Sequence, residues 1–595
     1  MSIPRHEYPR PQFQRKDWVC LNGTWQFERD EGDTGIERNI LSRELKERIT
    51  VPFCPESALS GIGHVDFMNA VWYRRDVKIP DAWAGKRALL HFQACDYDTT
   101  VWVSGKEAYR HRGGHTPFTV DLSPFAKAGE SVTLVVRARD DSRNQQPCGK
   151  QSMRYGNFGC HYTRTTGIWQ TVWMEPVGVT AFKRPRITPD VANNRFRIET
   201  PLDGLTAKGL TVSATLSANG KQLAEAKVNA GLDLAAQFEL NVPADQRKLW
   251  SPESPFLYDL AFELRDAKGT VLDRIESYAG LRSVTLDGKK VLINGKSVFQ
   301  RLVLDQGYYP NGILTAPDDE ALKKDIELSM QAGFNGARLH QKVFEERFLY
   351  HADKLGYLVW GEFPDWGSNV NGPAGDNQKH TIGYVTEWLE AIERDYSHPS
   401  IIGWCPLNET WQEISDKLTN LDAVTRAMFL ATKALDTSRP VLDASGYSHR
   451  VYETDIYDCH DYEQNPEKFK ANQCAPLAEG KPFQNGGGKW NVPYRGQPFF
   501  VSEFGGIWWN PNAKAGEDSW GYGDRVKNIE EFYARFDGLC AVLLDDPNMF
   551  GYCYTQLTDV YQEQNGIFAF DRGGKFDMAR IAAAQKRPAA IEREG

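Results

Sequence analysis

Two glutamates in the second half of the chain, Glu409 and Glu503, have the side chain needed to cleave a glycosidic bond. Two carboxyl groups hydrolyse such a bond: one protonates the leaving oxygen, and the other attacks the anomeric carbon or activates water. Glutamate suits both tasks because its long side chain reaches either face of a sugar ring. If the two carboxyl groups face each other about 5–5.5 Å apart, the predicted reaction retains the anomeric configuration.

The segments around both glutamates predict a C-terminal (β/α)8 TIM barrel over residues 284–595. Short apolar segments alternate there with helical patterns, and eight strands favour a closed parallel barrel over an open sheet. The predicted strands are Ser297–Asp305, Asn335–His340, Tyr357–Phe363, Ile401–Leu407, Val441–Ser445, Asp455–Tyr462, Pro498–Glu503 and Met549–Gln556. The predicted helices are Asp318–Gly333, Val343–Leu355, Ile382–Tyr396, Ala423–Leu435 and Asn528–Leu539.

The carboxyl ends of these strands are the predicted site, because active sites of such barrels lie there. Glu409 and Glu503 end the fourth and seventh strands, which stand on opposite sides of the barrel mouth. Neighbouring polar and aromatic residues are candidate substrate contacts: Asn408, Asp305, Arg338, His340, Trp366, His460, Tyr462, Trp508 and Trp509. The connection Glu463–Arg495 is long enough to predict a functional loop over the site.

Several of these residues have an alternative, purely structural role. Arg338 could form a salt bridge beneath the nucleophile instead of binding sugar, and Asp305 could pair with Arg338. The three tryptophans could stack on a sugar ring, or they could fill the contact between the barrel and the preceding domain.

Two β-sandwiches are predicted before the barrel, a jelly-roll-like one at residues 1–180 and an immunoglobulin-like one at 181–283. Both predictions rest on short segments in which apolar and polar residues alternate, bounded by glycine, proline and asparagine. In the first they are Ala70–Ile79, Ala88–Ser104 and Ser131–Ala138, and in the second Thr211–Ala218, Ala236–Val242 and Leu257–Leu264.

Charge and composition exclude several kinds of partner. The formal net charge of −9 is spread along the chain, so we expect no nucleic-acid or membrane partner. The amino terminus has no apolar signal region, which predicts a cytoplasmic protein. The ten cysteines contain no CxxC pair, and Gln306 and Tyr308 stand where a metal-dependent barrel hydrolase would have a His-x-His pair. We therefore expect mostly buried thiols, no metal and no other cofactor.

Motifs along nearly the whole chain resemble glycoside hydrolase family 2, which contains β-galactosidases, β-glucuronidases and β-mannosidases. In the first sandwich they are Leu21-Asn22-Gly23-Thr24-Trp25, Val71-Trp72-Tyr73-Arg74-Arg75 and Thr166-Gly167-Ile168-Trp169-Gln170. In the barrel, Gly403-Trp404-Cys405-Pro406-Leu407-Asn408-Glu409 resembles the acid/base segment and Val501-Ser502-Glu503-Phe504-Gly505 the nucleophile segment.

The resemblance implies a role for each matching residue. Glu409 would be the general acid and then the general base, and Glu503 would form the glycosyl-enzyme intermediate. Asn408 would hydrogen-bond the sugar 2-hydroxyl, and Tyr462 matches a tyrosine near the nucleophile. The resemblance also makes a homodimer plausible.

The terminal sugar is predicted from departures from the family pattern. Gln564-Asn565-Gly566-Ile567 lacks the lysine by which β-glucuronidases hold the sugar carboxylate, and such a clamp needs a cation. We therefore expect an exo-acting enzyme that releases a terminal neutral sugar, and a β-galactoside is the first choice of substrate. The alternatives are an α-L-arabinosidase, a β-glucuronidase or a β-galacturonidase. The alternative that is not an enzyme is a carbohydrate-binding protein, and we would expect such a protein to lack one of the two glutamates.

Overall fold

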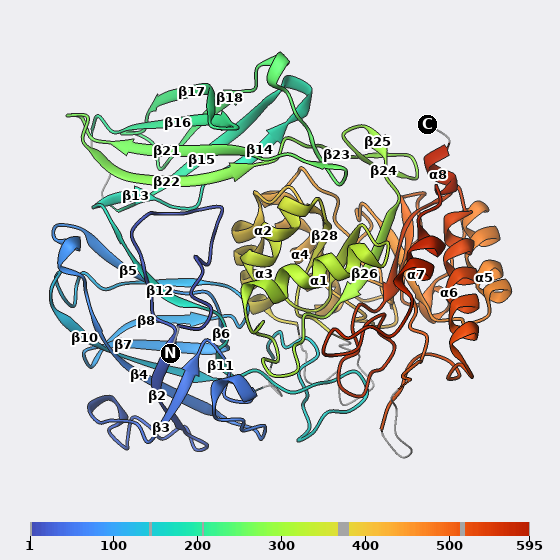
Figure 1. Cartoon of the computed structure of the whole chain (residues 1–595), viewed down its shortest axis with the longest axis horizontal. Helices are drawn as coiled ribbons and strands as arrows, with labels where there is room; N and C mark the ends of the chain where they lie inside the picture. The colour runs from blue at the N-terminus through green and yellow to red at the C-terminus, as the bar shows by residue number, and fades with distance from the viewer. Residues whose placement is uncertain (1–2, 142–144, 205–207, 367–379, 512–517, 594–595) are drawn as a thin grey trace.

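The chain folds into two β-sandwiches and a barrel, as the sequence predicts (Figure 1). This computed structural model describes residues 3–141, 145–204, 208–366, 380–511 and 518–593. The first sandwich lies below the second in Figure 1, and the barrel occupies the other half of the molecule beside both. No helix in the described part of the chain is both long and apolar enough to span a membrane.

Two main sheets form the first sandwich. One has the order β1-β12-β5-β9 and the other β3-β2-β4-β10-β7-β8. Their strands are Val19–Cys20, Val172–Val177, Arg87–Phe92 and Phe118–Asp121, then Glu47–Val51, Gly23–Arg29, Ala70–Lys78, Ser131–Arg139, Asp98–Val103 and Lys106–Arg112. The predicted single segment Ala88–Ser104 is wrong as one strand, because the chain there crosses from β5 in one sheet to β7 in the other. A short bridge between β6 (Cys95–Asp96) and β11 (Gly167–Ile168) marks the crossing.

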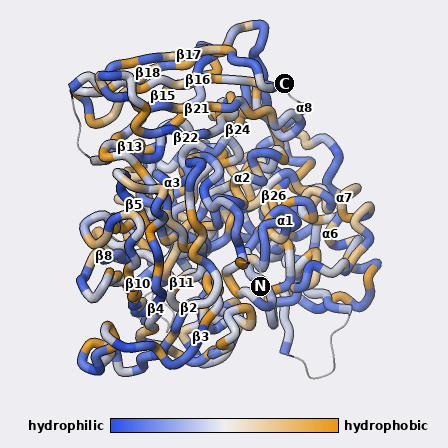
Figure 2. Tube along the Cα trace, turned by 60° about the vertical axis from the view of Figure 1, so that its left-hand side comes forward, coloured by the Kyte–Doolittle hydropathy of each residue, from blue (hydrophilic) through white to orange (hydrophobic). Residues whose placement is uncertain are grey.

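The second sandwich consists of β13, β14, β15 and β18 against β17-β16-β21-β22. These strands are Thr180–Phe182, Arg186–Asp190, Arg195–Gly204 and Ala235–Asn241, then Lys221–Asn229, Thr211–Ala218, Tyr258–Arg265 and Val271–Ala279. Alternate residues of β16, Val212, Ala214 and Leu216, are fully buried, so the period of two in the sequence correctly identifies the core face. The same alternation is visible along the strands in Figure 2.

The barrel sheet has seven parallel strands in the order β29-β28-β27-β26-β32-β31-β30. They are Ile401–Cys405, Leu358–Glu362, Gly336–Leu339, Gln300–Asp305, Met549–Thr555, Phe499–Gly505 and Tyr457–Asp461. The helices are α1 Asp319–Gln331, α2 Glu346–Leu355, α3 Ile382–Asp395, α4 Asn420–Leu435, α5 Pro466–Ala478, α6 Ile529–Leu544, α7 Met578–Gln585 and α8 Ala590–Arg593. Asp318 caps α1 by accepting from the Ala321 amide at 2.8 Å, as expected for an N-cap aspartate.

Two predictions for the barrel are wrong. Val441–Ser445 is not a strand: it meets β29 and its continuation only through isolated bridges, Trp404 to Val441 and Asn408 to Ser445. Backbone hydrogen bonds still join the two segments, since the Leu442 amide donates to Trp404 O at 2.9 Å and Ser445 O accepts from the Glu409 amide at 2.9 Å. The Glu463–Arg495 connection is not a plain loop either, because α5 occupies its first part.

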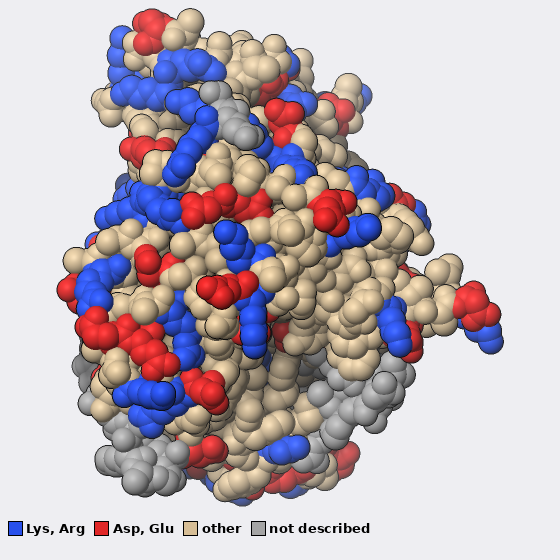
Figure 3. Space-filling view, turned by 90° about the vertical axis from the view of Figure 1, so that its right-hand side faces the viewer, with Lys and Arg blue, Asp and Glu red and all other residues tan. Residues whose placement is uncertain are grey.

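The surface carries charges of both signs. Lysine and arginine alternate with aspartate and glutamate over the face drawn in Figure 3, without a single-sign field. All ten cysteines are free thiols, and seven of them are buried, which confirms the prediction of mostly buried thiols.

Candidate active site

Glu409 and Glu503 face each other at the carboxyl ends of the barrel strands. Glu409 follows β29, and Glu503 lies within β31. One carboxylate oxygen of each residue and one ring nitrogen of His460 all lie within 4.8 Å of one another. This spacing suits a nucleophile that attacks the sugar directly, because an inverting pair needs room for a water molecule between the carboxyl groups.

Irregular backbone aims both glutamates at the mouth. Glu409 has a φ of 50°, a left-handed conformation that costs a non-glycine residue about 1–3 kcal/mol. Around Glu503 the strand registers shift, between Cys459 and His460 on one side and between Val501 and Phe504 on the other. Bulges of this kind redirect side chains next to active sites. His460 thereby becomes the cross-strand partner of Glu503.

Arg338 supports Glu503 from below. Its guanidinium is fully buried and contacts Glu362 at 2.7 Å and Glu503 at 3.1 Å. It also donates to the side-chain oxygen of Asn408 at 2.6 Å. The structural alternative for Arg338, a salt bridge beneath the nucleophile, matches this geometry. Arg338 fixes the Asn408 oxygen, and the Asn408 amide nitrogen is buried without a hydrogen-bond partner among the described residues, so it could donate to a ligand.

Tyr462 holds the second oxygen of the nucleophile. Its hydroxyl donates to Glu503 at 2.5 Å and lies 3.1 Å from the Thr555 hydroxyl. Tyr522 stacks parallel to the Tyr462 ring, with centroids 3.3 Å apart. The tyrosine that the resemblance places near the nucleophile is therefore in hydrogen-bond contact with it.

His460 forms an ion pair with the proposed acid. Its Nδ1 lies 2.7 Å from Glu409 and 3.4 Å from Glu503. Burial lowers the pKa of His460, but the two carboxylates outweigh it and raise the pKa above its usual value. The converse holds for Glu409: burial raises its pKa, whereas His460 and the Trp366 indole, which donates at 2.9 Å, bring it below the usual range. The pair therefore shares one proton.

His340 is buried beside the same cluster. Its Nδ1 lies 3.1 Å from Glu362 and 3.9 Å from Glu503. Burial, together with the charges of Lys150 and Arg338, holds the pKa of His340 well below its usual value. His340 is thus a neutral imidazole at the wall of the site.

Three predicted contacts are not brought to the glutamate pair. The Asp305 carboxylate accepts from the Gly307 amide at 2.9 Å, and burial together with Asp325 raises its pKa to about 7. The alternative pairing with Arg338 is not formed, since Arg338 bonds to Glu362, Asn408 and Glu503 instead. Trp508 packs against Gly521, and Trp509 packs against the barrel core, so both contacts lie within the barrel and not between the barrel and the first sandwich.

Sequence reasoning missed four residues that the fold brings to the site. Lys150 and His161 come from the first sandwich, and each lies against Trp366, with the Lys150 ammonium 5.8 Å and the His161 ring 4.2 Å from its centroid. Tyr447 lies beside Glu409, whose carboxylate raises the phenol pKa. Glu563 accepts from the Tyr162 hydroxyl. The sequence around residues 150 and 161 does not identify them as site residues, because they reach the barrel only through the docking of the two domains.

Glu409, Glu503 and His460 could approach a metal ion, but their chemistry fits an ion pair better. A metal would need the free lone pair of His460 Nδ1, and the raised pKa of His460 keeps a proton there.

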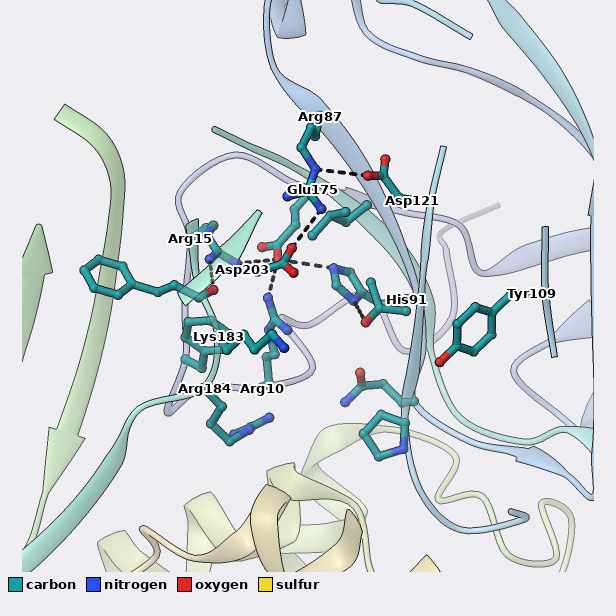
Figure 4. Close-up of a pocket in the computed structure, with 16 residues that line it drawn as sticks. Arg10, Arg15, Arg87, His91, Tyr109, Asp121, Glu175, Lys183, Arg184 and Asp203 are labelled. Carbon is teal, nitrogen blue, oxygen red and sulfur yellow. Dashed lines mark hydrogen bonds and ion pairs between the residues drawn. The ribbon is translucent and has the colours of Figure 1, made fainter. Parts of the chain in front are cut away.

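A separate cavity of about 460 Å³ lies at the junction of the two sandwiches (Figure 4). None of its lining residues belongs to the glutamate cluster. Its charges are largely paired: Arg15 contacts Glu175 at 2.6 Å, and Arg87 contacts Asp203 at 2.8 Å and Asp121 at 3.0 Å. These ion pairs join the amino-terminal segment to both sandwiches, which is a structural role.

Three family models match successive stretches of the chain. The model for the sugar binding domain of glycosyl hydrolases family 2 matches residues 19–144. The model described as glycosyl hydrolases family 2 matches residues 180–282, and the model for the family's TIM barrel domain matches residues 284–484. These matches confirm the three-part architecture and the resemblance seen in the sequence motifs.

Curated relatives are similar over much of the chain. A β-glucuronidase of Paenibacillus borealis is 25% identical over 71% of this chain and 72% of its own length. A β-glucuronidase of Canis lupus familiaris is 26% identical over 76% and 71%. A β-galactosidase of Thermoanaerobacter pseudethanolicus is 27% identical over 63% of this chain and 48% of its own length.

Solved structures share the fold. A Lactobacillus rhamnosus β-glucuronidase superposes with a TM-score of 0.78 at 21% identity, over 99% of this chain and all of the other. A Ruminococcus gnavus β-glucuronidase in complex with uronic isofagomine gives the same TM-score at 18% identity, over 99% of this chain and all of the other. At this identity the likeness concerns the fold alone.

Proposed function

We propose that this chain, which belongs to glycosyl hydrolase family 2, is an exo-acting enzyme that releases a terminal β-linked hexuronic acid with retention of configuration. The observation that carries the retaining mechanism is the placement of the Glu409 and Glu503 carboxylates within 4.8 Å of each other. That the chain is a glycoside hydrolase follows from its family. The roles of individual residues and the identity of the sugar are the proposal.

The proposed reaction has two displacement steps. In the first, Glu503 attacks the anomeric carbon while Glu409 gives its proton to the leaving oxygen, so a glycosyl ester forms on Glu503. In the second, Glu409 takes a proton from water, and the resulting hydroxide displaces Glu503 from the sugar. Arg338 and Tyr462 stabilise the Glu503 carboxylate in its free form. The free Asn408 amide would donate to the sugar 2-hydroxyl.

The choice of a hexuronic acid departs from the β-galactoside expected first from the sequence. β-Glucuronidase names prevail among the reported relatives, so the β-glucuronide alternative is better supported than β-galactoside. The expectation of a neutral sugar also depended on the lack of a cation in the site. Lys150 now supplies one beside Trp366. A β-galactoside remains the second candidate, because the buried Glu563 carboxylate adds negative charge to the same region.

Exo action is proposed because the first sandwich closes one side of the barrel mouth. The Gly149 amide donates to Pro364 O at 2.8 Å, and the Trp520 indole donates to Gly159 O at 2.9 Å. The segment 149–162 therefore lies against the barrel loops. A mouth closed on one side admits a chain end, whereas an open groove would admit an internal stretch of polymer.

A panel of nitrophenyl glycosides tests the sugar. We expect the highest kcat/KM on the β-D-glucuronide or β-D-galacturonide, and a highest value on the β-D-galactoside would replace the first candidate by the second. Oligosaccharide digestion tests exo action: monosaccharide should appear from the first turnover, and early release of mixed oligosaccharides would contradict it.

A further inference from the structure

We propose that Lys150, carried by the first sandwich, binds the carboxylate of the terminal sugar and so selects hexuronides over neutral glycosides. The inference rests on the proposed function and deepens it. It assigns sugar specificity to a residue outside the catalytic barrel, and it replaces the lysine that the sequence lacks near Asn565.

Lys150 reaches the glutamate cluster from the edge of the sandwich. The residue is 8% exposed, and its ammonium nitrogen lies 5.8 Å from the centroid of the Trp366 ring. The indole nitrogen of Trp366 donates to Glu409 at 2.9 Å. Lys150 is therefore one side chain away from the proposed acid, on the wall that the sandwich contributes.

The backbone around Lys150 is fixed against the barrel. Gly149 donates to Pro364 O at 2.8 Å, and Lys150 O accepts from the Tyr162 amide at 2.8 Å. Gly149 has a φ of 52°, and a Cβ there would lie 2.4 Å from Gln341 O. This close approach requires glycine. The hydroxyl of Tyr162 in turn hydrogen-bonds Glu563.

Comparison with the other buried lysines distinguishes Lys150 from a structural lysine. The described part of the chain buries three lysines, at positions 150, 342 and 575. Lys342 donates to two carbonyl oxygens, of Gly307 and Leu314, each at 2.7 Å. Lys575 pairs with Asp559 at 2.8 Å. Lys150 has neither a hydrogen bond nor an ion pair with any described residue, so its three donors are available to a ligand.

The surroundings keep Lys150 charged. Burial lowers the pKa of a lysine, but the carboxylates of Glu563, Glu503 and Glu409 together raise the pKa of Lys150 above its usual value. Its charge also contributes, after burial, to lowering the pKa of His161 to about 3. A buried, charged and unpaired ammonium is costly in the empty site, and a substrate carboxylate would remove this cost.

The test compares Lys150→Met with wild type on 4-nitrophenyl β-D-glucuronide and β-D-glucoside, which differ only at C6. Loss of a hydrogen bond to a charged group should lower kcat/KM on the glucuronide about 10- to 150-fold. The glucoside value should change less than about threefold. Lys150→Arg, which keeps the charge, should recover part of the loss. Lys106→Met, an exposed change on the same sandwich, is the matched control and should behave as wild type on both substrates.

The outcomes separate this inference from the proposed function. If wild type cleaves glucuronide and Lys150→Met loses equally on both substrates, or loses nothing, Lys150 is not the carboxylate partner. If wild type prefers neutral glycosides and cleaves no hexuronide, the proposed sugar is wrong and the inference falls with it. Unfolding midpoints for every variant show whether a general loss reflects misfolding.

Discussion

His460 Nδ1 lies 2.7 Å from the Glu409 carboxylate, so the proposed acid and its neighbour hold one proton between them. A carboxyl group that must donate a proton near neutral pH usually needs a raised pKa. Here the pKa of Glu409 is lowered and that of His460 is raised. We propose that the imidazole stores the proton that Glu409 would deliver to the leaving oxygen.

The first prediction concerns pH. In wild type the shared proton is lost only as pH rises through the raised pKa of His460, which lies above 6.5. In His460→Gln the proton must reside on Glu409 alone, and a carboxyl group ordinarily releases its proton at lower pH than an imidazole does. The alkaline limb of the kcat/KM profile should therefore move to lower pH. An unchanged alkaline limb would show that His460 does not hold the proton.

The second prediction concerns the acid step. Glu409→Ala should lose several orders of magnitude on substrates with poor leaving groups. It should lose much less in the glycosylation of dinitrophenyl glycosides, whose leaving oxygen needs little protonation. Single-turnover rates on both substrate types provide the measurement. Equal losses would count against Glu409 as the acid.

The third prediction concerns Tyr462, which donates to Glu503 at 2.5 Å. Tyr462→Phe removes this donor while keeping the ring that stacks on Tyr522. We expect kcat to fall about 10- to 100-fold, since hydrogen bonds to charged groups contribute about 1.5–3 kcal/mol. The unfolding midpoint should stay within a few degrees of wild type. A large drop in the midpoint with kcat preserved would assign Tyr462 a packing role.

The fourth prediction concerns stability beneath the nucleophile strand. His449 lies between Asp443 at 2.8 Å and Asp458 at 3.2 Å. Burial lowers its pKa, but the two aspartates raise it from 6.5 to about 10. The stabilisation by the charged imidazole is thus complete below pH 6.5 and is lost as pH rises through about 10.

His449→Asn should therefore destabilise the protein by about 3–5 kcal/mol at pH 6, because two buried carboxylates lose their cation. The difference from wild type should shrink toward pH 10. Thermal unfolding of both proteins across this range is the measurement. A difference independent of pH would mean that His449 is neutral in the folded state.

The sequence predicts the architecture well because each of the three domains has its own periodicity of apolar residues. Strand β16 coincides with its predicted range, and helix α1 begins one residue after its predicted start. At Val441–Ser445 the apolar run correctly predicts a segment beside β29, but the two pair only at isolated points and form no regular strand there.

The proposed catalytic pair could also be brought together from the sequence, since the strand ends of a barrel converge. Lys150 could not, because its position depends on how the sandwich docks, and no pattern within residues 149–162 encodes that. Asp305 shows the converse limit: it ends a strand as predicted, yet its carboxylate accepts from the Gly307 amide and its pKa responds to Asp325 rather than to the glutamate pair.

The most direct test of the central claim is to trap the intermediate and locate it. An activated 2-deoxy-2-fluoro glycoside of the preferred sugar slows both steps, and a good leaving group lets the first one proceed. Mass spectrometry of the digested protein should find one glycosyl group per chain, on the peptide containing Glu503, and Glu503→Gln should remain unlabelled. Label on another residue, or an inverted anomer as the first product seen by NMR, would contradict the account.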